Sequence, residues 1–443
     1  MKWGRVLPVF LVLMLAASTS FAAGFRLPEA GVKAMGMGFA FTAQADDPSA
    51  IYFNPAGLTQ LEGKNLMLGA TYVKENGGKY AGTTPVDDFL TGFTTQKSET
   101  QKTLHFLIPN GYFTSTNKET GIAWGIGVFA PFGLGQQYVS NSASIFRNQT
   151  TKIDLQTVVI NPTIAFEINE MLSVGFGIDY MYGTATLGKT PWSPLLLGAN
   201  NGNVYELELE GDGDAWGYNF GILLKPTPNL RIGANYRSPF ELNIKGGDVD
   251  LSNINPGVAP LFGGSTFHTQ GDATVSMPAT FAIGVAYTWD RLTVEADADW
   301  TFWSSYESLP ITIKDEVPPG VPDANQILRS TDARKDWRDV CALRLGAEYR
   351  ATDKLALRAG FVYDPTPVPA ETMGPELPDS TRLNYMLGLG YKFGSWTIDV
   401  AGMYIDKKDR TVNNQVGLPT MTGFNGTWTG DAWLAGLDVG YKF

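Results

Sequence analysis

Apolar and polar positions alternate with a period of two along the end of the chain. Between residues 433 and 443, apolar side chains are separated by glycine, aspartate, lysine and one leucine. Successive side chains of a strand point to opposite faces, so this stretch predicts a strand with one apolar, aromatic face and one small or charged face. Its apolar positions are Trp433, Ala435, Leu437, Val439, Tyr441 and Phe443.

The same alternation recurs throughout the chain, for example over 172–183, 292–302 and 385–393. Segments of about ten residues with alternating hydrophobicity and aromatic ends are typical of membrane β-barrels, which in bacteria have an even number of strands. Counting such segments predicts about 14 antiparallel strands, near 65–74, 103–113, 121–130, 153–168, 172–187, 205–225, 230–244, 271–289, 292–306, 337–350, 354–364, 381–393, 395–406 and 431–443.

The connections between these segments are alternately short and long. Bacterial barrels have short periplasmic turns and longer outer loops, so the alternation supports the same fold. The short connections are 169–171, 226–229, 290–291, 351–353 and 394–395, and the long ones are about 75–102, 132–150, 188–204, 246–269, 307–335, 365–380 and 408–430.

The start of the chain indicates export. Lys2 and Arg5 precede an apolar run from Val6 to Ala17, and small residues precede a cleavage site after Ala22, which is the layout of a secretory signal peptide. The apolar run is shorter than the roughly 20 residues of a spanning helix. Export and length both favour a membrane barrel over a soluble β-sandwich, the alternative that also alternates. We therefore expect a signal peptide over 1–22 and a barrel over 65–443.

Composition narrows the function further. Charged residues are 17% of the chain, against about 25% in soluble domains, and the net charge of −11 disfavours a nucleic-acid partner. The single cysteine, Cys341, cannot form an internal disulfide. The two histidines, His105 and His268, have no Ser or Asp at diagnostic spacing and no metal-ligand spacing, so we expect neither an enzyme nor a cofactor.

One acidic cluster remains, formed by Glu295, Asp297 and Asp299 on one face of a predicted strand. A polar interior is usual for such barrels, so we expect these carboxylates to join a charge network in the lumen. An alternative is that one of the arginines meets a substrate carboxylate. The other expected members are Arg231, Arg237, Arg344, Glu348, Arg358 and Asp399.

Residues 23–64 do not alternate and predict a separate compact segment. Asp47 and Pro48 resemble the start of a short helix, from Pro48 to Phe53, that ends near Asn54 because Pro55 disfavours helical geometry before it. Such a segment either folds back into the lumen as a plug or hangs as a loose periplasmic tail. A barrel of this size has an interior that side chains alone do not fill, which favours the plug.

The motifs of this segment resemble those of the FadL family, which transports long-chain fatty acids and aromatic hydrocarbons across the outer membrane of Gram-negative cells. The resemblance rests on 23–29 (AGFRLPE), 35–40 (MGMGFA), 45–50 (ADDPSA) and 52–58 (YFNPAGL). It implies an N-terminal hatch over 23–64. Outside the hatch, the likeness is one of strand and loop pattern.

The resemblance also implies a route. Hydrophobic substrate is captured among the outer loops, passes to a pocket beside Gly24 and Phe25, and leaves sideways through a kink in the third strand after the hatch moves. Asn54, Pro55 and Ala56 would belong to the gating element. The kink would fall within 121–130, with Gly125 and Gly127 as candidates because glycine tolerates a bend.

Several outer-loop clusters are unusually apolar and are candidates for the capture groove, and packing of loop against loop is the alternative for each. They are Leu195, Leu196 and Leu197; Leu261 and Phe262; and Phe89 and Leu90.

Tyr441 and Phe443 resemble the terminal signal read by the barrel-assembly machinery. The other expected partners are hydrophobic substrate and outer-membrane lipid with lipopolysaccharide, and we expect a monomer. A general porin for small polar solutes is the second hypothesis, and a lipid hydrolase, for which no nucleophile and base are found, is the third.

Overall fold

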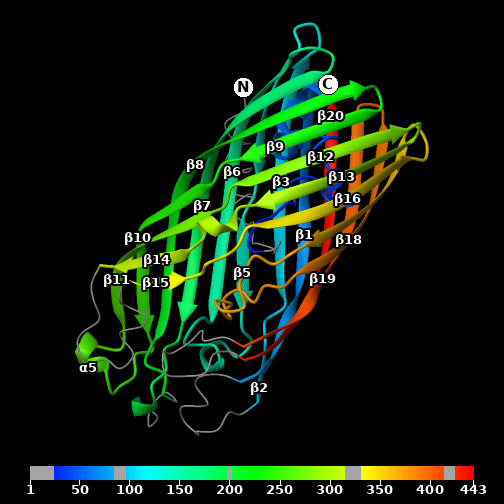
Figure 1. Ribbon diagram of the computed structural model, residues 1–443. Coiled ribbons are helices and arrows are strands. Elements are labelled where there is room, and N and C mark those ends of the chain that lie inside the picture. The colour runs from blue at the N-terminus through cyan, green and yellow to red at the C-terminus, as the bar shows by residue number, and fades with distance from the viewer. Residues whose placement is uncertain (1–23, 84–95, 197–201, 315–330, 414–424) are drawn as a thin grey trace.

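The wall of the molecule is one closed antiparallel sheet of 14 strand positions, as predicted. The computed structural model describes residues 24–83, 96–196, 202–314, 331–413 and 425–443. Neighbours in sequence are neighbours in the sheet, and β1 closes the ring by pairing with β20 from Asn65–Lys442 to Gly82–Gly426 (Figure 1). Undivided strands are β1 (Gly63–Gly82), β3 (Leu104–Asn117), β6 (Lys152–Glu167), β7 (Leu172–Lys189), β8 (Glu206–Thr227), β17 (Leu355–Asp364), β18 (Arg382–Phe393), β19 (Trp396–Val412) and β20 (Gly426–Lys442).

Five positions in the wall are each made of two consecutive strands with an interruption between them. Proline stands in or beside three of these interruptions, at Pro131, Pro239 and Pro278, where it removes a ladder donor. The pairs are β4 (Ile122–Phe129) with β5 (Gly133–Gln137), β9 (Leu230–Arg237) with β10 (Phe240–Ser252), β11 (Phe267–Met277) with β12 (Thr280–Trp289), β13 (Leu292–Thr301) with β14 (Ser308–Ile313), and β15 (Thr331–Arg334) with β16 (Val340–Arg350). The short β2 (Lys97–Thr100) extends the β3 position along β1.

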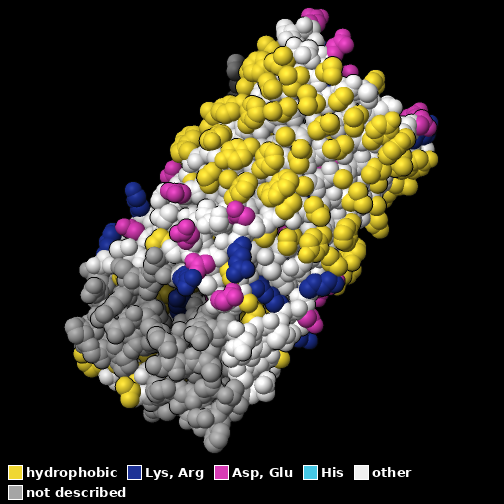
Figure 2. All heavy atoms as spheres, in the orientation of Figure 1, with side chains coloured by type: hydrophobic (Ala, Val, Ile, Leu, Met, Phe, Trp, Pro, Cys, Tyr) yellow, Lys and Arg dark blue, Asp and Glu magenta, His cyan; other side chains and the backbone are white. Residues whose placement is uncertain are grey.

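On the face shown in Figure 2, an apolar belt covers the half of the barrel that carries the C-terminus in Figure 1, and a band of charged side chains borders it. Exposed aliphatic side chains such as Leu343 (54%) and Leu387 (72%) alternate there with buried inward ones. A belt of this kind is what strands in contact with lipid require. The predicted tight turns join β6 to β7, β8 to β9, β12 to β13, β16 to β17 and β18 to β19.

Several strands are longer than the alternation of apolar residues predicted. β1 reaches Gly82, β10 reaches Ser252, and β20 begins at Gly426, within stretches expected to be loops. The backbone ladder does not depend on lipid, so pairing continues beyond the apolar belt wherever two strands stay adjacent. Apolar periodicity detects only the part of each strand that faces the membrane.

Residues 24–62, the N-terminal segment, lie inside the ring of strands. They include the helices α2 (Val32–Gly36) and α3 (Ala50–Phe53) and the 3₁₀ helix η2 (Pro55–Gln60), and nearly all their side chains are buried. α3 begins two residues later than expected, and Asn54 after it is extended (φ −167°), as the following proline requires. No helix in the described ranges is long and apolar enough to cross a membrane.

Candidate functional site

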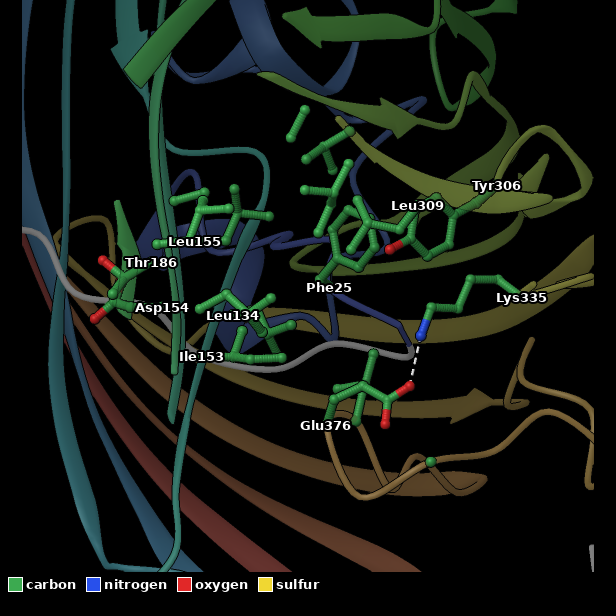
Figure 3. A pocket seen from close by; sticks show the side chains of 18 of the residues that line it. Phe25, Leu134, Ile153, Asp154, Leu155, Thr186, Tyr306, Leu309, Lys335 and Glu376 are labelled. Carbon is green, nitrogen blue, oxygen red and sulfur yellow. Dashed lines mark hydrogen bonds and ion pairs between the residues drawn. The ribbon is translucent and has the colours of Figure 1, made fainter. Parts of the chain in front are cut away.

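A cavity of about 110 Å³ lies in the half of the barrel away from the C-terminus. Apolar side chains from the inner faces of several strands form most of its wall, and Phe25 of the N-terminal segment stands among them (Figure 3). Because the lining is mainly aliphatic and aromatic, the cavity favours an apolar occupant by about 25 cal/mol per Å² of apolar surface buried. Lining residues from the wall include Leu134, Leu155, Leu209, Ile244, Val275 and Leu309.

Phe25 is held by a cluster of rings. Its ring centroid lies 4.7 Å from that of Trp303, 5.4 Å from Tyr306 and 5.7 Å from Trp337, mostly edge to face. Gly24 has φ +70°, and a Cβ there would lie 2.5 Å from Trp303 Cζ2, so only glycine fits. Phe25 thus lines this cavity, and Gly24 packs behind it on two tryptophans.

The cavity also carries one ion pair. Lys335 Nζ lies 2.5 Å from Glu376 Oε1, and both side chains are largely buried (Figure 3). Burial alone would lower the pKa of Lys335, but the adjacent carboxylate reverses this, and the pKa is raised. Burial would raise the pKa of Glu376, and the lysine lowers it. Both groups therefore stay charged at the edge of an apolar space.

The wall is interrupted beside this cavity, between β4 and β5. Residues 104–110 of β3 pair with β1 but have no ladder partner on their other side among the described residues, and β5 pairs only with β6. The N-terminal segment fills the inner side of the break: Leu27 N donates to Pro131 O (2.8 Å), and Gly133 N donates to Phe25 O (2.8 Å). One short stretch of chain thus borders both the cavity and the break.

The two glycines named as kink candidates do not lie at this interruption. Gly125 and Gly127 pair with β3 on one side and β6 on the other, within continuous β4, and the break falls at residues 130–132. Pro131 is the signal that sequence reasoning missed, because a proline cannot donate to the ladder. Instead, both glycines make room for Ile51: a Cβ at either would lie 2.9 Å from that side chain.

Asn54 ties the N-terminal segment to the wall. Its Nδ2 donates to Thr42 O (2.7 Å) and to Ile222 O of β8 (2.9 Å), and its Oδ1 accepts from Ala56 N (3.1 Å). From the wall, Asn219 Nδ2 donates to Ile51 O at the end of α3 (3.0 Å). Pro55 and Ala56 lie against Gly175 of β7, where a Cβ would be 2.5 Å from each backbone.

The acidic cluster on β13 binds backbone rather than arginine at two of its three positions. Asp297 accepts from the N–H groups of Phe41 and Thr42 (3.0 Å each), and Glu295 accepts from those of Ala43 and Gln44 (2.7 and 2.9 Å). The expected charge network exists around them, and sequence reasoning missed several of its members, among them Arg26, Asp179 and Lys33, which lies 3.6 Å from Glu348. Asp299 pairs with Arg344 and with Arg26, Arg358 with Glu348 and Asp399, and Arg237 with Asp179, while Arg231 only approaches Thr288 (3.4 Å).

Comparison with known proteins gives this geometry a family. Residues 13–443 match the family model "Outer membrane protein transport protein (OMPP1/FadL/TodX)". The chain belongs to this family. It is 28% identical to a long-chain fatty acid transport protein of Escherichia coli O6:H1 (98% of this chain, 97% of the relative) and 25% identical to outer membrane protein P1 of Haemophilus influenzae (97% of each).

Solved structures show the same fold. A FadL homologue of Pseudomonas aeruginosa superposes with a TM-score of 0.77 (20% identity, 95% of this chain and 100% of that one). The toluene transporter TbuX of Ralstonia pickettii gives 0.65 (21% identity, 93% and 98%). The transporter described here is thus an outer-membrane β-barrel of a family that moves hydrophobic compounds, and several of its relatives are named as long-chain fatty acid transport proteins.

The candidate capture residues of the transporter are not equally accessible. Leu195 and Leu261 are exposed (82% and 44%), but Phe262 is buried (9%) against Tyr205 and Phe267 in a small apolar core outside the belt, and Leu196 packs partly against that core. Phe262 therefore packs against a neighbouring segment rather than facing solvent. Phe89, Leu90 and Leu197 lie outside the described residues.

The remaining candidates can be placed briefly. Phe443 is exposed (66%) and its ring stacks edge to face on Tyr441 at the end of β20. His105 bonds to Tyr72 and His268 to Asp250, both on the outer surface. Within the described ranges, no three His, Cys, Asp or Glu side chains are grouped to hold a metal.

Proposed function

We propose that this transporter takes up amphiphilic hydrophobic acids, of which long-chain fatty acids are the leading class. The observation that carries the proposal is the apolar cavity with Lys335 on its wall. An alkyl chain gains from burial against the aliphatic lining, and a carboxylate can replace Glu376 as the partner of the ammonium group. Relatives named for long-chain fatty acids support this class, and a structural neighbour named for toluene makes neutral aromatic hydrocarbons the second candidate.

The proposed route follows the features described above. Leu195 and Leu261 give substrate a first apolar contact, and the cavity holds it against Phe25. Displacement of residues 25–27 from the β4–β5 break then opens a path through the wall into the membrane. The element around Asn54, with Pro55 and Ala56, acts as the gating link, because its hydrogen bonds are polar and worth only about 1 kcal/mol each.

The proposal includes how the chain is divided and what it meets. Residues 1–22 would be a signal peptide, 23–64 the hatch and 65–443 the barrel. Outer-membrane lipid and lipopolysaccharide would surround a monomer, and the assembly machinery would read Tyr441 and Phe443. Removing Phe443 should lower the yield of heat-modifiable barrel, and normal abundance would contradict that last role.

Growth and uptake distinguish the substrate classes. A deletion strain carrying the transporter should take up oleate, and Lys335→Met should raise the oleate concentration needed for half-maximal uptake while leaving toluene uptake unchanged. Glu376→Gln serves as the matched control, because it frees the ammonium group and should not weaken oleate uptake. Toluene uptake without oleate uptake would assign the neutral class instead.

The general porin remains the alternative in planar bilayers. A lumen filled by the N-terminal segment should carry little steady ion current, and deletion of 25–60 should raise it. A large constant conductance of the intact protein would support the porin hypothesis.

A further inference from the structure

Arg26 is the only arginine of residues 24–62, and it lies at the break between β4 and β5. Its backbone forms an isolated antiparallel bridge with Phe132 on the other side of the break. The two backbone hydrogen bonds that hold residues 25–27 to the break flank it on either side. Any displacement of residues 25–27 from the break therefore moves Arg26 as well.

The side chain of Arg26 is held by a carboxylate that has a second cationic partner. Arg26 Nη1 donates to Asp299 Oδ1 (2.8 Å) and to Thr301 Oγ1 (2.9 Å). Arg344 Nη2 lies 2.6 Å from Asp299 Oδ2, and all three charged side chains are largely buried. Breaking a buried ion pair usually costs much, because one charge is left without a partner. Here Asp299 keeps Arg344, so the departure of Arg26 leaves no unpaired carboxylate in the wall.

The other cations of the lumen network cannot follow a substrate in this way. Arg237 on β9 pairs with a carboxylate of β7, and Arg358 on β17 bridges two carboxylates of the wall. Both partners in each of these pairs belong to the barrel. Lys33 does lie on the N-terminal segment, but its nearest partner, Asp46 (2.8 Å), lies on that segment too. Arg26 is thus the network arginine whose position changes relative to its partners when the segment moves.

Two small cavities, of about 20 and 30 Å³, are lined by both Arg26 and Arg344. Each has room for one or two water molecules. The smaller cavity also contains Phe132, so the space beside Arg26 reaches the break. Arg344 Nε and Asn235 Oδ1, on residues that line this smaller cavity, have no hydrogen-bond partner among the described residues. The surroundings of Arg26 are therefore polar and loosely filled, which leaves its side chain room to change partners.

A carboxylate that reaches the break loses water beside apolar side chains, and a charge taken out of water needs a partner. Lys335 holds the carboxylate in the cavity but belongs to the wall, between β15 and β16. We propose that Arg26 takes over the substrate carboxylate from Lys335 as residues 25–27 leave the break, exchanging Asp299 for the substrate. A guanidinium group stays charged and fits a carboxylate with two hydrogen bonds.

This role rests on the proposed function and makes Arg26 a specificity residue, which favours acids over neutral compounds of the same chain length. Arg26 does not line the cavity in the closed structure, so it acts on the rate of release and not on the affinity of the cavity. Lys335 acts on that affinity. The two residues should therefore affect different kinetic constants.

Uptake of oleate and of oleyl alcohol, in a deletion strain at matched amounts of heat-modifiable barrel, tests the role. Arg26→Gln should lower the maximal rate of oleate uptake by about tenfold or more, as the loss of a hydrogen bond to a charged group does. The oleate concentration for half-maximal uptake and the uptake of oleyl alcohol should stay unchanged. Arg26→Lys should restore most of the oleate rate, because it keeps the charge. Arg231→Gln is the matched control: it removes another inward arginine, which among the described residues bonds only to Thr288 (3.4 Å), and should change neither uptake.

The outcomes separate this role from the function on which it rests. Oleate uptake by Arg26→Gln at the unmodified rate would overturn the role and keep the proposed function. Equal losses for oleate and oleyl alcohol would also overturn it, because a merely structural arginine at the break would affect both. If Arg26→Gln gives no heat-modifiable barrel, Asp299→Asn decides: it frees Arg26, and a selective loss of oleate uptake would contradict the role. Absence of oleate uptake in the unmodified protein would overturn the proposed function, and this role with it.

Discussion

Both halves of β8 alternate with a period of two, but the apolar side chains point outward in one half and inward in the other. From Trp216 to Phe220 the outward side chains are aromatic and exposed, and the inward Asn219 is polar and buried. From Glu206 to Asp214 the outward side chains are acidic, and the inward Leu207 and Leu209 are buried. The outer face of this strand therefore changes from lipid-facing and apolar to water-facing and polar. Its inner face changes from polar to apolar over the same length.

This inversion shows what shapes the cavity. In the lipid-facing half, the inside is polar and is filled by the N-terminal segment with its carboxylate and amide anchors. In the half beyond the belt, outward polar side chains face water. The inward apolar side chains are not covered by most of the N-terminal segment, and they line the cavity around Phe25. A hydrophobic binding site thus arises in the part of the barrel that is not in hydrocarbon.

The comparison predicts its largest effect for a charge on the lipid face. Leu387→Arg, at an exposed position near the middle of β18, should lower the free energy of unfolding by about 2–4 kcal/mol. Glu210→Arg, outward on the water-exposed half of β8, should change it by no more than about 0.5 kcal/mol. Urea titration in lipid vesicles measures both. Equal losses would show that Glu210 also faces lipid.

A smaller effect, on the free energy of substrate binding, is expected for substitutions inside the half of the barrel beyond the belt. Leu155→Ala removes a buried leucine from the cavity wall and should weaken binding of a fluorescent fatty acid by up to about 1.5–3 kcal/mol. Leu223→Ala makes the same truncation at a buried inward position that does not line the cavity, so binding should be unchanged. If both variants bound as the unmodified protein does, substrate would lie elsewhere.

A polar anchor in the lipid-facing half should matter less. Asn54→Ala loses three hydrogen bonds at a site with no exposure, and each is worth about 1 kcal/mol. The barrel should remain folded while uptake changes at matched surface expression. Asn65→Ala, whose amide bonds to Glu62 O near the surface, is the control. An unmodified rate in Asn54→Ala would remove the gating role from this element.

The smallest expected effect is a pH-dependent change at the edge of the N-terminal segment. Burial raises the pKa of Glu29 to about 7, with Arg382 and Arg344 opposing in part. The neutral form is thus favoured in the folded protein, so its stabilising contribution is complete below about pH 4.5 and is lost as pH rises towards 7. Tryptophan emission, sensitive to Trp303 and Trp337, should shift over this range and much less in Glu29→Gln. Identical profiles would exclude Glu29 as the group responsible.

The features that could be predicted best from the sequence are the strand spans that face lipid. Lipid requires an apolar outward face, so the spans around Leu343, Leu387 and Trp433 could be read directly from the alternation. The end of the short helix at Asn54 could also be predicted, because Pro55 restricts the backbone of the residue before it. Strand extensions beyond the belt, such as that of β10 from Gly246 to Ser252, were missed because their outward side chains are not apolar, as at Asp248 and Asp250.

Contacts across the lumen could not be predicted in this way. Gly125 and Gly127 looked like bends because nothing in the sequence shows that Ile51 packs against them. The carboxylates of Glu295 and Asp297 looked like partners for arginine, but the N-terminal segment offers them four consecutive backbone N–H groups. These pairings depend on how two distant parts of the chain dock, which no local pattern encodes.

The wall glycines that lie against the N-terminal segment, such as Gly175, also limit which parts of such proteins can be exchanged. A Cβ at Gly221 would meet the side chain of Asn54, and one at Gly233 would meet the backbone of Thr42, so each wall glycine is matched to one position of the N-terminal segment. A chimera that takes residues 24–62 from a relative only 28% identical, but keeps this wall, would combine surfaces that were never fitted to each other. The unit that can be transplanted is therefore the segment together with the wall strands that carry these glycines.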